Sequence, residues 1–341
     1  MTPFFPPCAG SGLPLGLGGA PLGNLFSAVS DEDALALVKA AWASGCRSFD
    51  TAPHYGHGLS EHRLGAALRH CAHDFSRQDF VLSSKVGRLL TPDAAAPRAQ
   101  HGYVDILPFR QSWDFSASGT RRSVEDSLQR LGLASLDVAY VHDPDVATHG
   151  DRAPEVLRQV LAETLPALQQ LKAEGVIRAI GLGTNDVAVV LQVLRQADLD
   201  VLMLAGRYSL LDHSALPELL PQCVARGVRI ALGGVFNSGL LATGTRHAGA
   251  TFNYAPAAPQ WLVRTAQIEA VCASHGVPLR AAALQFPLAH PAVDMVMLGA
   301  RNAQEWSDAQ AMLQHPIAPE FWAALRAQNL LPPEAPTPSL P

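Results

Sequence analysis

The sequence predicts an α/β protein in which eight parallel strands, each followed by a helix, close into a single-domain (β/α)8 barrel of the TIM type. Short apolar runs alternate with amphipathic segments of helical length, and this alternation occurs eight times without a change of composition that would mark a linker. Apolar residues make up 48% of the 341-residue chain and charged residues 16%, which allows one large core. We expect the barrel to span residues 1–330 and the Pro-rich end at 331–341 to be disordered.

The elements follow one another from the N-terminus in a regular order. A strand interrupted by glycines is expected at 13–23, followed by a helix at 31–45 with acidic residues in its first turn. The strand at 46–52 leads into a helix at 60–70, for which Ser60 is the expected N-cap. The remaining strands are expected at 79–87, 136–142, 177–183, 199–208, 228–234 and 293–301, with helical segments between them.

A doubly wound open sheet is the alternative arrangement for the same alternation of strands and helices. That fold binds dinucleotides through a G-x-G-x-x-G loop between its first strand and its first helix. The stretch GLGGAPLG contains Gly16, Gly18 and Gly23, but no helix follows it at once and no suitable acidic residue ends a second strand. We interpret these glycines as a barrel strand with close backbone approaches.

Composition argues against several kinds of partner and location. The net charge is −5 and no block of Lys or Arg occurs, so we expect no binding to nucleic acid. The five cysteines lie far apart without a C-x-x-C pair, which indicates buried thiols in a reducing compartment rather than a disulfide framework or a zinc site. The N-terminus lacks the features of a secretory signal, and no apolar run reaches about 18 residues, so we expect a cytoplasmic protein without a membrane partner.

Reactive side chains lie at the ends of three consecutive predicted strands. Asp50 ends the second strand and Tyr55 follows five residues later, Lys85 lies on the third strand, and His142 ends the fourth. Each has an ordinary structural explanation alone, but the C-terminal strand ends of a barrel form one face, where active sites lie. An ammonium beside a phenol lowers the pKa of the phenol from about 10, and a carboxylate keeps that ammonium charged. The set therefore predicts proton transfer by Tyr55.

The stretch FDTAPHYGHGLSEHRLG around Tyr55 has two other interpretations. An Asp with a His is typical of hydrolases, and His54, His57 and His62 are three potential metal ligands. Two of these histidines lie on a glycine-containing loop and the third on a predicted helix, which does not favour a common metal ion. We expect no metal, and we interpret His54 and His57 as pocket or exposed loop residues.

The motifs together resemble the aldo-keto reductase superfamily over nearly the whole chain. GCRSFDTAPHYGHGLSEHRLGAAL resembles its first signature, VLSSKVG the strand with its catalytic Lys, and SLDVAYVHDPD the strand with its catalytic His. IRAIGLGTN, GGVFNSGLLATG and VMLGAR resemble its cofactor-binding segments. The resemblance implies a barrel that binds NAD or NADP without a doubly wound domain. It also implies that Tyr55 is the general acid/base, that Lys85 lowers its pKa, that Asp50 pairs with Lys85, and that His142 orients the substrate oxygen.

The resemblance further implies a set of cofactor-binding residues. The pair that binds the nicotinamide carboxamide falls at Gly183-Thr184 or, with a shift of one residue, at Thr184-Asn185, and the loop around the pyrophosphate resembles the segment from Gly234 to Leu240. The implied cofactor contacts are Thr184, Asn185, Gly234, Phe236, Asn237, Ser238, Gly239, Leu240, Gly299, Arg301 and Glu305.

Three positions depart from the family pattern. The Gln common at the end of the sixth strand falls on Ala205, and the aromatic residue beneath the nicotinamide falls on Gly233 or its neighbour, with Phe236 as a candidate substitute. Glu305 lies close to where NADPH-dependent members carry an Arg for the 2′-phosphate. A carboxylate repels that phosphate, so NAD is the expected cofactor, and Arg301 keeps NADP as the alternative. The favourable position of an acid in the first turn of a helix explains Glu305 equally well.

Within the superfamily, GGAPLGNLF, LAGRYSLLD and AALQFPLAHP most resemble the bacterial aldose 1-dehydrogenase branch. This implies oxidation of the C1 hemiacetal of a pyranose, of the L-fucose, L-galactose or D-arabinose type, to the lactone by hydride transfer to nicotinamide. Pyridoxal 4-dehydrogenase, a relative of that branch, gives the alternative substrate. A non-catalytic NADP-binding regulatory barrel is the alternative from another class, and the intact set of four strand-end residues argues against it.

Contacts to the sugar are expected from the loops at the same face. His54 adjoins Tyr55 and is, with His142, an expected substrate contact. The long segment at 88–118 follows the third strand, and loops of this length are usually functional or disordered. Its Trp113 is the third expected contact, because an indole stacks on a sugar face, and anchoring of the loop is the alternative role. The acids of the HDPDVATHGD loop are candidate partners for sugar hydroxyls, with solvated loop charge as the alternative.

Overall fold

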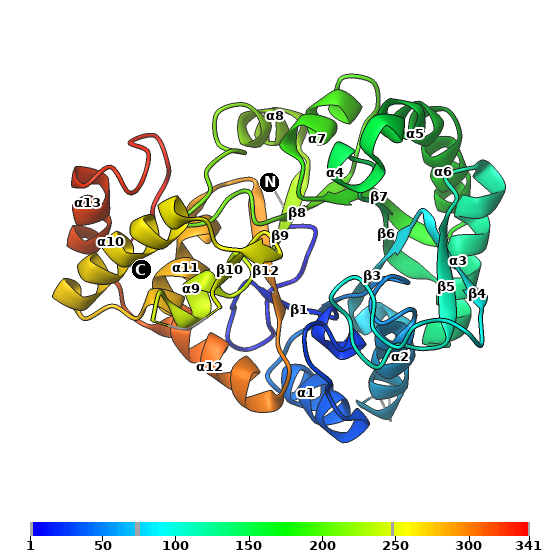
Figure 1. Ribbon diagram of the computed structural model, residues 1–341, viewed down its shortest axis with the longest axis horizontal. Helices are drawn as coiled ribbons and strands as arrows, with labels where there is room; N and C mark the ends of the chain where they lie inside the picture. Colours follow the sequence, from blue (N-terminus) through cyan, green and yellow to red (C-terminus); the bar gives the residue numbers. More distant parts are fainter. Residues whose placement is uncertain (1–2, 72–75, 247–248, 340–341) are drawn as a thin grey trace.

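The computed structural model describes residues 3–71, 76–246 and 249–339, and within them eight parallel strands close into a barrel (Figure 1). Around the barrel the order is β1-β12-β9-β8-β7-β6-β3-β2, and each pair of neighbours is parallel. The predicted (β/α)8 barrel is thereby confirmed. The barrel strands are β1 (Leu15–Gly18), β2 (Ser48–Asp50), β3 (Val81–Val86), β6 (Leu136–His142), β7 (Ile177–Thr184), β8 (Val201–Ala205), β9 (Arg229–Gly233) and β12 (Val293–Gly299).

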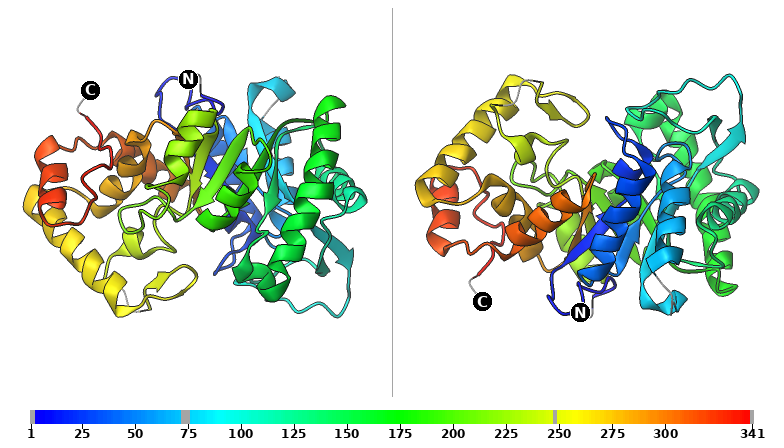
Figure 2. Two further views of the ribbon diagram at one scale, coloured as in Figure 1. Left: turned by 90° about the horizontal axis from the view of Figure 1, so that it is seen from above. Right: turned by 90° about the horizontal axis from the view of Figure 1, so that it is seen from below.

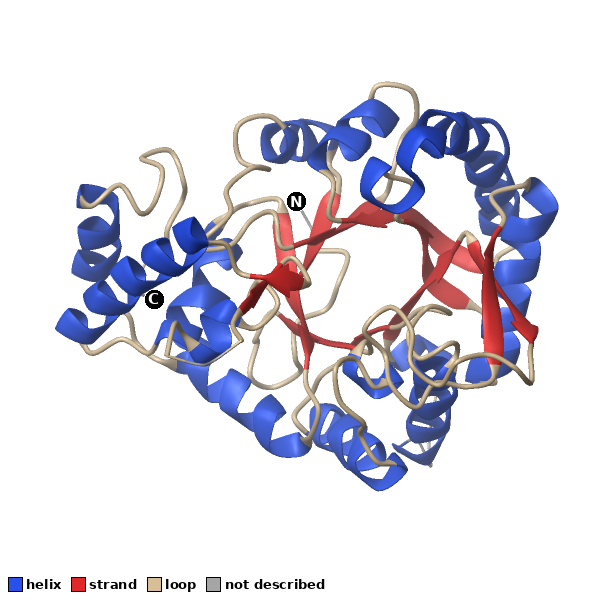
Figure 3. Ribbon diagram, in the orientation of Figure 1, coloured by secondary structure: helices blue, strands red, loops and turns tan. Residues whose placement is uncertain are grey.

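Helices surround the ring of strands, as the colouring of Figure 3 shows. The first and last described segments of the chain lie on the same face of the molecule, as both views of Figure 2 show. The α-helices are α1 (Asp31–Ala43), α2 (Leu59–Cys71), α3 (Ala117–Leu131), α4 (Val146–His149), α5 (Ala153–Gln159), α6 (Leu165–Ala173), α7 (Val187–Leu194), α8 (Leu219–Arg226), α9 (Leu240–Thr243), α10 (Pro259–His275), α11 (Leu279–Gln285), α12 (Ala303–Gln314) and α13 (Pro319–Ala327).

The segment at 88–118, expected as a long loop, contains a β-hairpin. Strands β4 (Arg88–Pro92) and β5 (Phe109–Trp113) pair antiparallel outside the barrel. The residues of β5 are all exposed or half-buried, so the strand has no continuous apolar face. For this reason no strand pattern is visible in the sequence at these positions. A second small hairpin is formed by β10 (Thr251–Phe252) and β11 (Ala255–Pro256).

Side chains at alternate strand positions fill the barrel interior. On β6, Val138 and Tyr140 belong to the interior cluster, whereas Ala139 and Val141 pack in the layer between strands and helices. Phe5, from the segment before β1, joins the interior cluster. The backbone N–H of Phe4 donates to Asp294 near the start of β12, at 2.7 Å. The N-terminal segment therefore closes the end of the barrel opposite the C-terminal strand ends.

One prediction about an individual segment is corrected. Ser60 does not cap a helix that starts after it: α2 begins at Leu59, and the buried Ser60 hydroxyl donates to the carbonyl of Gly19 at 2.7 Å. The disorder expected at 331–341 stays a prediction, and among the described residues Leu331 and Ala335 are buried in the main apolar cluster. Ala335 is buried, and its carbonyl accepts a hydrogen bond from Arg326 at 2.8 Å. Residues 340–341 lie outside the described part of the chain.

The cysteines are free thiols, as predicted, and four of the five are buried, while Cys71 is half-buried. In the described part of the chain, we find no helix that combines the length and the apolar character needed to cross a membrane.

Candidate active site

A buried ion pair joins the ends of the second and third barrel strands. The Lys85 ammonium on β3 donates to both carboxylate oxygens of Asp50 on β2, at 2.9 and 2.7 Å, and to the carbonyl of Thr51 at 2.9 Å. The hydroxyl of Ser83, two residues before Lys85, donates to the same carboxylate at 2.7 Å. Because all three ammonium hydrogens have an acceptor, Lys85 is held in one position inside the barrel mouth.

Tyr55 lies over this ion pair. The Lys85 Nζ atom is 4.7 Å from the centre of the Tyr55 ring. Close packing of the backbone fixes the loop that carries the tyrosine, because a Cβ on Gly23 would lie only 2.4 Å from the carbonyl carbon of Tyr55. The following residue, Gly56, has a left-handed φ of 64°, a conformation that favours glycine. The two glycines allow the chain to turn the phenol back over the end of β2.

The pKa of Tyr55 moves opposite to the direction expected from Lys85 alone. Burial raises the pKa of Tyr55 well above its ordinary value of 10, and the negative charge of Asp50 raises it further. The reason is that the carboxylate neutralises Lys85 at short range, so the nearby cation does not offset the loss of hydration. The phenol therefore keeps its proton in the free protein. The expected role of Lys85 in lowering this pKa stays a prediction, and any such effect is smaller than the rise caused by burial and Asp50.

His142 completes the group at the end of β6. Its ring centre is 6.2 Å from that of Tyr55, nearly perpendicular to it. Burial lowers the pKa of His142 well below 6.5, and the charges of Arg88 and Lys85 lower it further. The imidazole is therefore neutral and able to donate or accept a hydrogen bond with a substrate oxygen. The structure thus brings Asp50, Tyr55, Lys85 and His142 together at one barrel face.

Tyr55 lies between two cavities at this face. The first has a volume of about 540 Å³ and the second about 390 Å³, and Tyr55 lines both of them. Lys85 and His142 line the second cavity with His54. Of the predicted cofactor contacts, Thr184 lines the second cavity, and Leu240 is fully buried outside both linings. Those that line the first cavity are Asn185, Gly234, Phe236, Asn237, Ser238, Gly239, Gly299, Arg301 and Glu305.

The family model described as "Aldo/keto reductase family" matches residues 14–329. The chain belongs to the aldo/keto reductase family. This aldo/keto reductase is 42% identical to the pyridoxal 4-dehydrogenase of Microbacterium luteolum over 328 residues, which cover 93% of this chain and 94% of that protein. It is 41% identical to the D-threo-aldose 1-dehydrogenase of Pseudomonas sp, with 97% and 99% covered. A solved glycerol dehydrogenase from Gluconobacter oxydans has a TM-score of 0.71 at 22% identity, with 96% and 94% covered, and so supports the fold alone.

Aldo/keto reductases use nicotinamide cofactors, and the first cavity of this one fits such a group. Its floor is formed by backbone at Ala205, Gly206, Gly233 and Gly234, where a Cβ added at Gly233 would meet nothing closer than 3.8 Å. The residues that follow turn tightly, since Asn237 and Ser238 are left-handed with φ of 47° and 58°. The N–H groups of Asn237 and Gly239 donate to the carbonyls of Gly234 and Phe236, so these bonds hold the turn in place. The open space at Gly233 and this turn together form a cradle for the cofactor.

The aromatic residues that line the first cavity include one that was predicted and two that were not. Phe236, the candidate substitute for an aromatic residue at Gly233, lines the cavity from the loop after β9. Phe26 and Tyr254 line both cavities, and their ring centres are 6.3 Å apart. Sequence reasoning missed these two, because each lies on an irregular loop and has a left-handed φ unusual for an aromatic residue. They are also among the most exposed large apolar side chains of the described residues, at 56% and 61%.

Two ion pairs lie at the far end of the first cavity. Arg301 donates to Oε1 of Glu305 at 2.9 and 2.6 Å, and its backbone N–H donates to the other carboxylate oxygen at 2.9 Å. Arg280 pairs with Asp308 at 2.6 Å. All four residues line the cavity. Each arginine is thus matched by a carboxylate, and the end of the cradle carries no excess positive charge.

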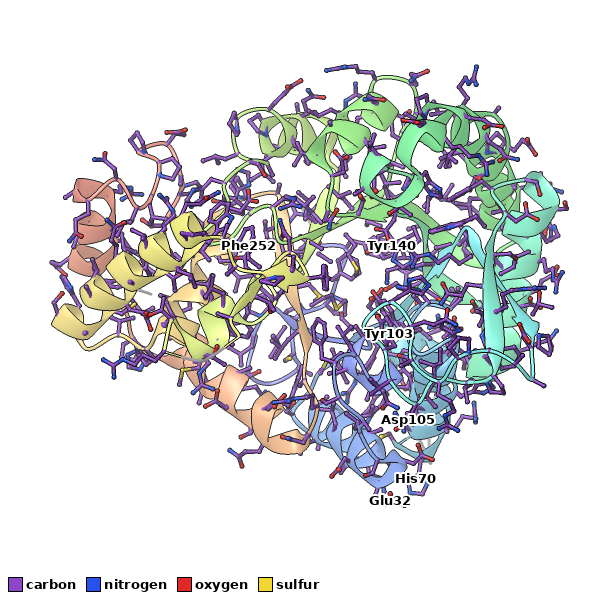
Figure 4. The ribbon with its side chains drawn as sticks, viewed as in Figure 1. Glu32, His70, Tyr103, Asp105, Tyr140 and Phe252 are labelled. Atoms are coloured by element: carbon purple, nitrogen blue, oxygen red, sulfur yellow. The ribbon has the colours of Figure 1, made fainter. Side chains whose placement is uncertain are left out.

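Acidic and aromatic side chains line the second cavity. Asp143 and Asp145, from the loop after His142, lie in its wall, as do His101 and Tyr103 from the loop between β4 and β5. Tyr103, marked in Figure 4, stacks on the Tyr55 ring with 6.0 Å between ring centres. The acids of the HDPD motif therefore face the site, whereas His101 carried no pattern that would have marked it.

Trp113 does not line either cavity, so its predicted contact with substrate is corrected. The indole packs on the outside of the β4–β5 hairpin, against the guanidinium of Arg88 at 4.2 Å and the ring of His149 at 4.5 Å. The three-histidine interpretation is not supported either, because no group of three His, Cys, Asp or Glu that could hold a metal occurs among the described residues.

Asp143 links His142 to a buried arginine. One carboxylate oxygen accepts from Arg88 Nη2 at 3.0 Å and lies 3.4 Å from Nε2 of His142. Burial raises the pKa of Asp143 from 3.8 to about 6, against the opposing effect of Arg88. A carboxylate held ionised at neutral pH despite this shift costs stability, which is typical of a functional site.

We therefore expect Asp143→Asn to gain stability relative to the unsubstituted protein as the pH rises. The folded protein binds the Asp143 proton more tightly than the unfolded chain, so this group's contribution to stability is present below about pH 4 and is lost as the pH rises through about 6. The free energy of unfolding of the variant, minus that of the unsubstituted protein, should increase by about 2–3 kcal/mol over this window. Urea unfolding at a series of pH values measures it.

The exposed Asp151→Asn serves as the matched control and should show almost no pH-dependent difference. A difference for Asp143→Asn that stayed constant from pH 4 to 7 would show that the carboxyl group is not destabilised by burial.

Proposed function

We propose that this aldo/keto reductase oxidises the C1 hemiacetal of an aldose pyranose to the lactone, with NAD as the cofactor. The observation that carries the proposal is the position of Tyr55 between the glycine-lined first cavity and the acid-lined second cavity. The proton of the C1 hydroxyl leaves toward a base and the hydride of C1 leaves toward the cofactor. The Tyr55 phenol lines both the first cavity, proposed for the cofactor, and the second cavity, proposed for the sugar. The 41% identity to a D-threo-aldose 1-dehydrogenase supports the same substrate class.

The residues of the chain account for the proton in this reaction. The bound nicotinamide supplies the hydride acceptor. Tyr55 accepts the proton of the C1 hydroxyl after losing its own, while the ammonium of Lys85, 4.7 Å from the ring, stabilises the resulting tyrosinate. The neutral imidazole of His142 hydrogen-bonds the same substrate oxygen and keeps it beside the phenol. Because the free phenol is protonated, oxidation should accelerate toward alkaline pH.

Pyridoxal is the second candidate substrate. The 42% identity to a pyridoxal 4-dehydrogenase and the exposed rings of Phe26 and Tyr254 at the mouth of both cavities support it. Both candidates are hemiacetals in their cyclic forms, so the same proton transfer serves either one. Initial rates with L-fucose, L-galactose, D-arabinose and pyridoxal separate them. Absence of turnover with every one of these, with NAD and with NADP, would instead support a non-catalytic regulatory barrel.

The cofactor preference is proposed from the charges at the end of the first cavity. Glu305 already engages Arg301, so a 2′-phosphate would meet a carboxylate and an arginine that has its partner. A ribose hydroxyl, in contrast, is a donor that a carboxylate oxygen accepts. NAD therefore fits this end better than NADP, and NADP is the alternative that kinetics decides.

Tyr55→Phe should lower kcat/KM for the best aldose by about 10²–10⁴-fold, because it removes the proton acceptor and keeps the ring. Tyr140→Phe is the matched control: its hydroxyl is buried within the barrel and has no hydrogen-bond partner among the described residues, so its removal should leave the rate nearly unchanged. NADH formation measured by absorbance gives both rates. Full turnover by Tyr55→Phe would overturn the mechanism.

Glu305→Gln should raise the ratio of kcat/KM with NADP to kcat/KM with NAD by about 10-fold, since it removes a like charge and releases Arg301 toward the 2′-phosphate. The exposed Glu320→Gln on α13 removes the same charge away from the cavity and should leave the ratio unchanged. Initial rates with both cofactors measure it. If the unsubstituted protein already prefers NADP strongly, the assignment of NAD is wrong.

A further inference from the structure

The β4–β5 hairpin fixes the hydrogen-bonding state of a histidine in the second cavity. His54 Nδ1 lies 3.0 Å from Oε1 of Gln111, and the side-chain amide of Gln111 donates back to the carbonyl of His54 at 3.4 Å. A backbone carbonyl only accepts, so it determines which end of the Gln111 amide faces it. The other end, Oε1, is then an acceptor too, and the hydrogen between Gln111 and His54 belongs to Nδ1 of the histidine.

This assignment leaves Nε2 of His54 as a bare acceptor. Burial lowers the pKa of His54 well below 6.5, and the charge of Arg88 lowers it further, so the ring is neutral and carries one hydrogen. That hydrogen is on Nδ1, and His54 lines the second cavity. Among the described residues no hydrogen bond to Nε2 occurs. The Nε2 atom of His54 therefore presents an uncharged lone pair to the second cavity, where it can accept a hydrogen bond from a substrate.

The neighbouring histidine of the same loop provides an internal comparison. His57 Nδ1 donates to the carbonyl of Phe109 at 2.6 Å, which fixes the same tautomer by a different partner on β5. Its Nε2 is buried without a partner and does not line either cavity. The backbone N–H of Leu107 also donates to the carbonyl of Gly56 at 3.2 Å. The hairpin and its connecting loop thus bind the Tyr55 loop at His54, Gly56 and His57. Of the two histidines, only His54 presents its free nitrogen to the second cavity.

The position of His54 selects one hydroxyl of a sugar. Its ring centre lies 6.3 Å from that of Tyr55 and 5.9 Å from that of His142. A sugar whose C1 oxygen lies between Tyr55 and His142 has two oxygens beside it, the ring oxygen and the oxygen on C2. The ring oxygen carries no hydrogen, so the C2 hydroxyl is the nearest donor for an acceptor on His54.

We propose that Nε2 of His54 accepts a hydrogen bond from the C2 hydroxyl of the sugar, and that Gln111 is the positioning residue that keeps this nitrogen bare. The proposal rests on the proposed function, since it assumes an aldose with C1 at Tyr55. It assigns the choice among aldoses in part to the hairpin outside the barrel, whose strands β4 and β5 line neither cavity.

The tautomer is tested by NMR on protein labelled with ¹⁵N in its histidines. Long-range ¹H–¹⁵N spectra distinguish Nδ1–H from Nε2–H rings, and comparison with His54→Phe and His57→Phe assigns the two signals. We expect both rings to be neutral with hydrogen on Nδ1. Gln111→Leu should move His54 toward the Nε2–H form while His57 stays unchanged. An Nε2–H signal for His54 in the unsubstituted protein would overturn the proposal.

The contact with substrate is tested with D-arabinose and 2-deoxy-D-ribose, which differ only at C2. Gln111→Leu should lower kcat/KM for D-arabinose by about 10-fold, in line with loss of one hydrogen bond, and should change the rate with 2-deoxy-D-ribose much less. Gln111→Glu still accepts from Nδ1 and should retain most of the preference for D-arabinose. Ser112→Ala, at the exposed neighbour on β5, is the matched control and should match the unsubstituted protein.

The outcomes separate the proposal from the proposed function. Equal loss with both sugars in Gln111→Leu would mean that Gln111 merely supports the fold, and would overturn its role in selecting the substrate. Turnover of neither sugar nor any other aldose by the unsubstituted protein would contradict the proposed function, and with it the contact to C2. In that case the spectra still decide whether His54 presents a bare acceptor to the cavity.

Discussion

The ion pair between Asp50 and Lys85 is the interaction on which the site depends. Burying two charges costs several kcal/mol per ion unless each finds partners, and here the ammonium has three oxygen acceptors and the carboxylate also accepts from Ser83. Asp50 and Ser83 are paired in register where β2 and β3 lie side by side. The parallel pairing of β2 and β3 provides this register, so the chemistry of the site depends on the order of the strands in the sheet.

The ion pair also determines the state of the phenol above it. A free ammonium at this distance would favour tyrosinate, but the carboxylate compensates it, and burial then dominates. Tyr55 is therefore neutral beside the fixed ammonium of Lys85. Its phenol loses the proton only when additional positive charge nearby or a higher pH stabilises the tyrosinate. The general acid and the general base of the reaction are two protonation states of one residue.

The sequence was informative where regular structure positions the residues. Asp50, Lys85 and His142 were predicted correctly at strand ends because alternating apolar patterns place β2, β3 and β6 within a few residues. Irregular segments carried no such pattern: β5 is neither apolar nor alternating, so neither its pairing with β4 nor its contact with His54 was predictable. The rise in the Tyr55 pKa could not be predicted from the sequence, because it is caused mainly by burial and then by Asp50, and the sequence contains neither the burial nor the distance.

The two cavities are lined by different parts of the chain. The first is built mainly from the glycine-rich ends of later strands, where backbone forms the walls. The second is lined by side chains from loops, among them those of His101, Tyr103 and Asp143. Loops change without cost to the barrel, so the substrate can differ between relatives while the cradle and the ion pair stay in place.

The most direct test of this account is an alkaline titration of the ultraviolet difference absorbance between the unsubstituted protein and Tyr55→Phe, without cofactor. The difference isolates the ionisation of Tyr55 from that of the other tyrosines. The account predicts no tyrosinate signal from Tyr55 below about pH 10, since burial and the charge of Asp50 raise its pKa. A tyrosinate signal that developed near neutral pH would contradict it, because it would show that Lys85 alone governs the phenol.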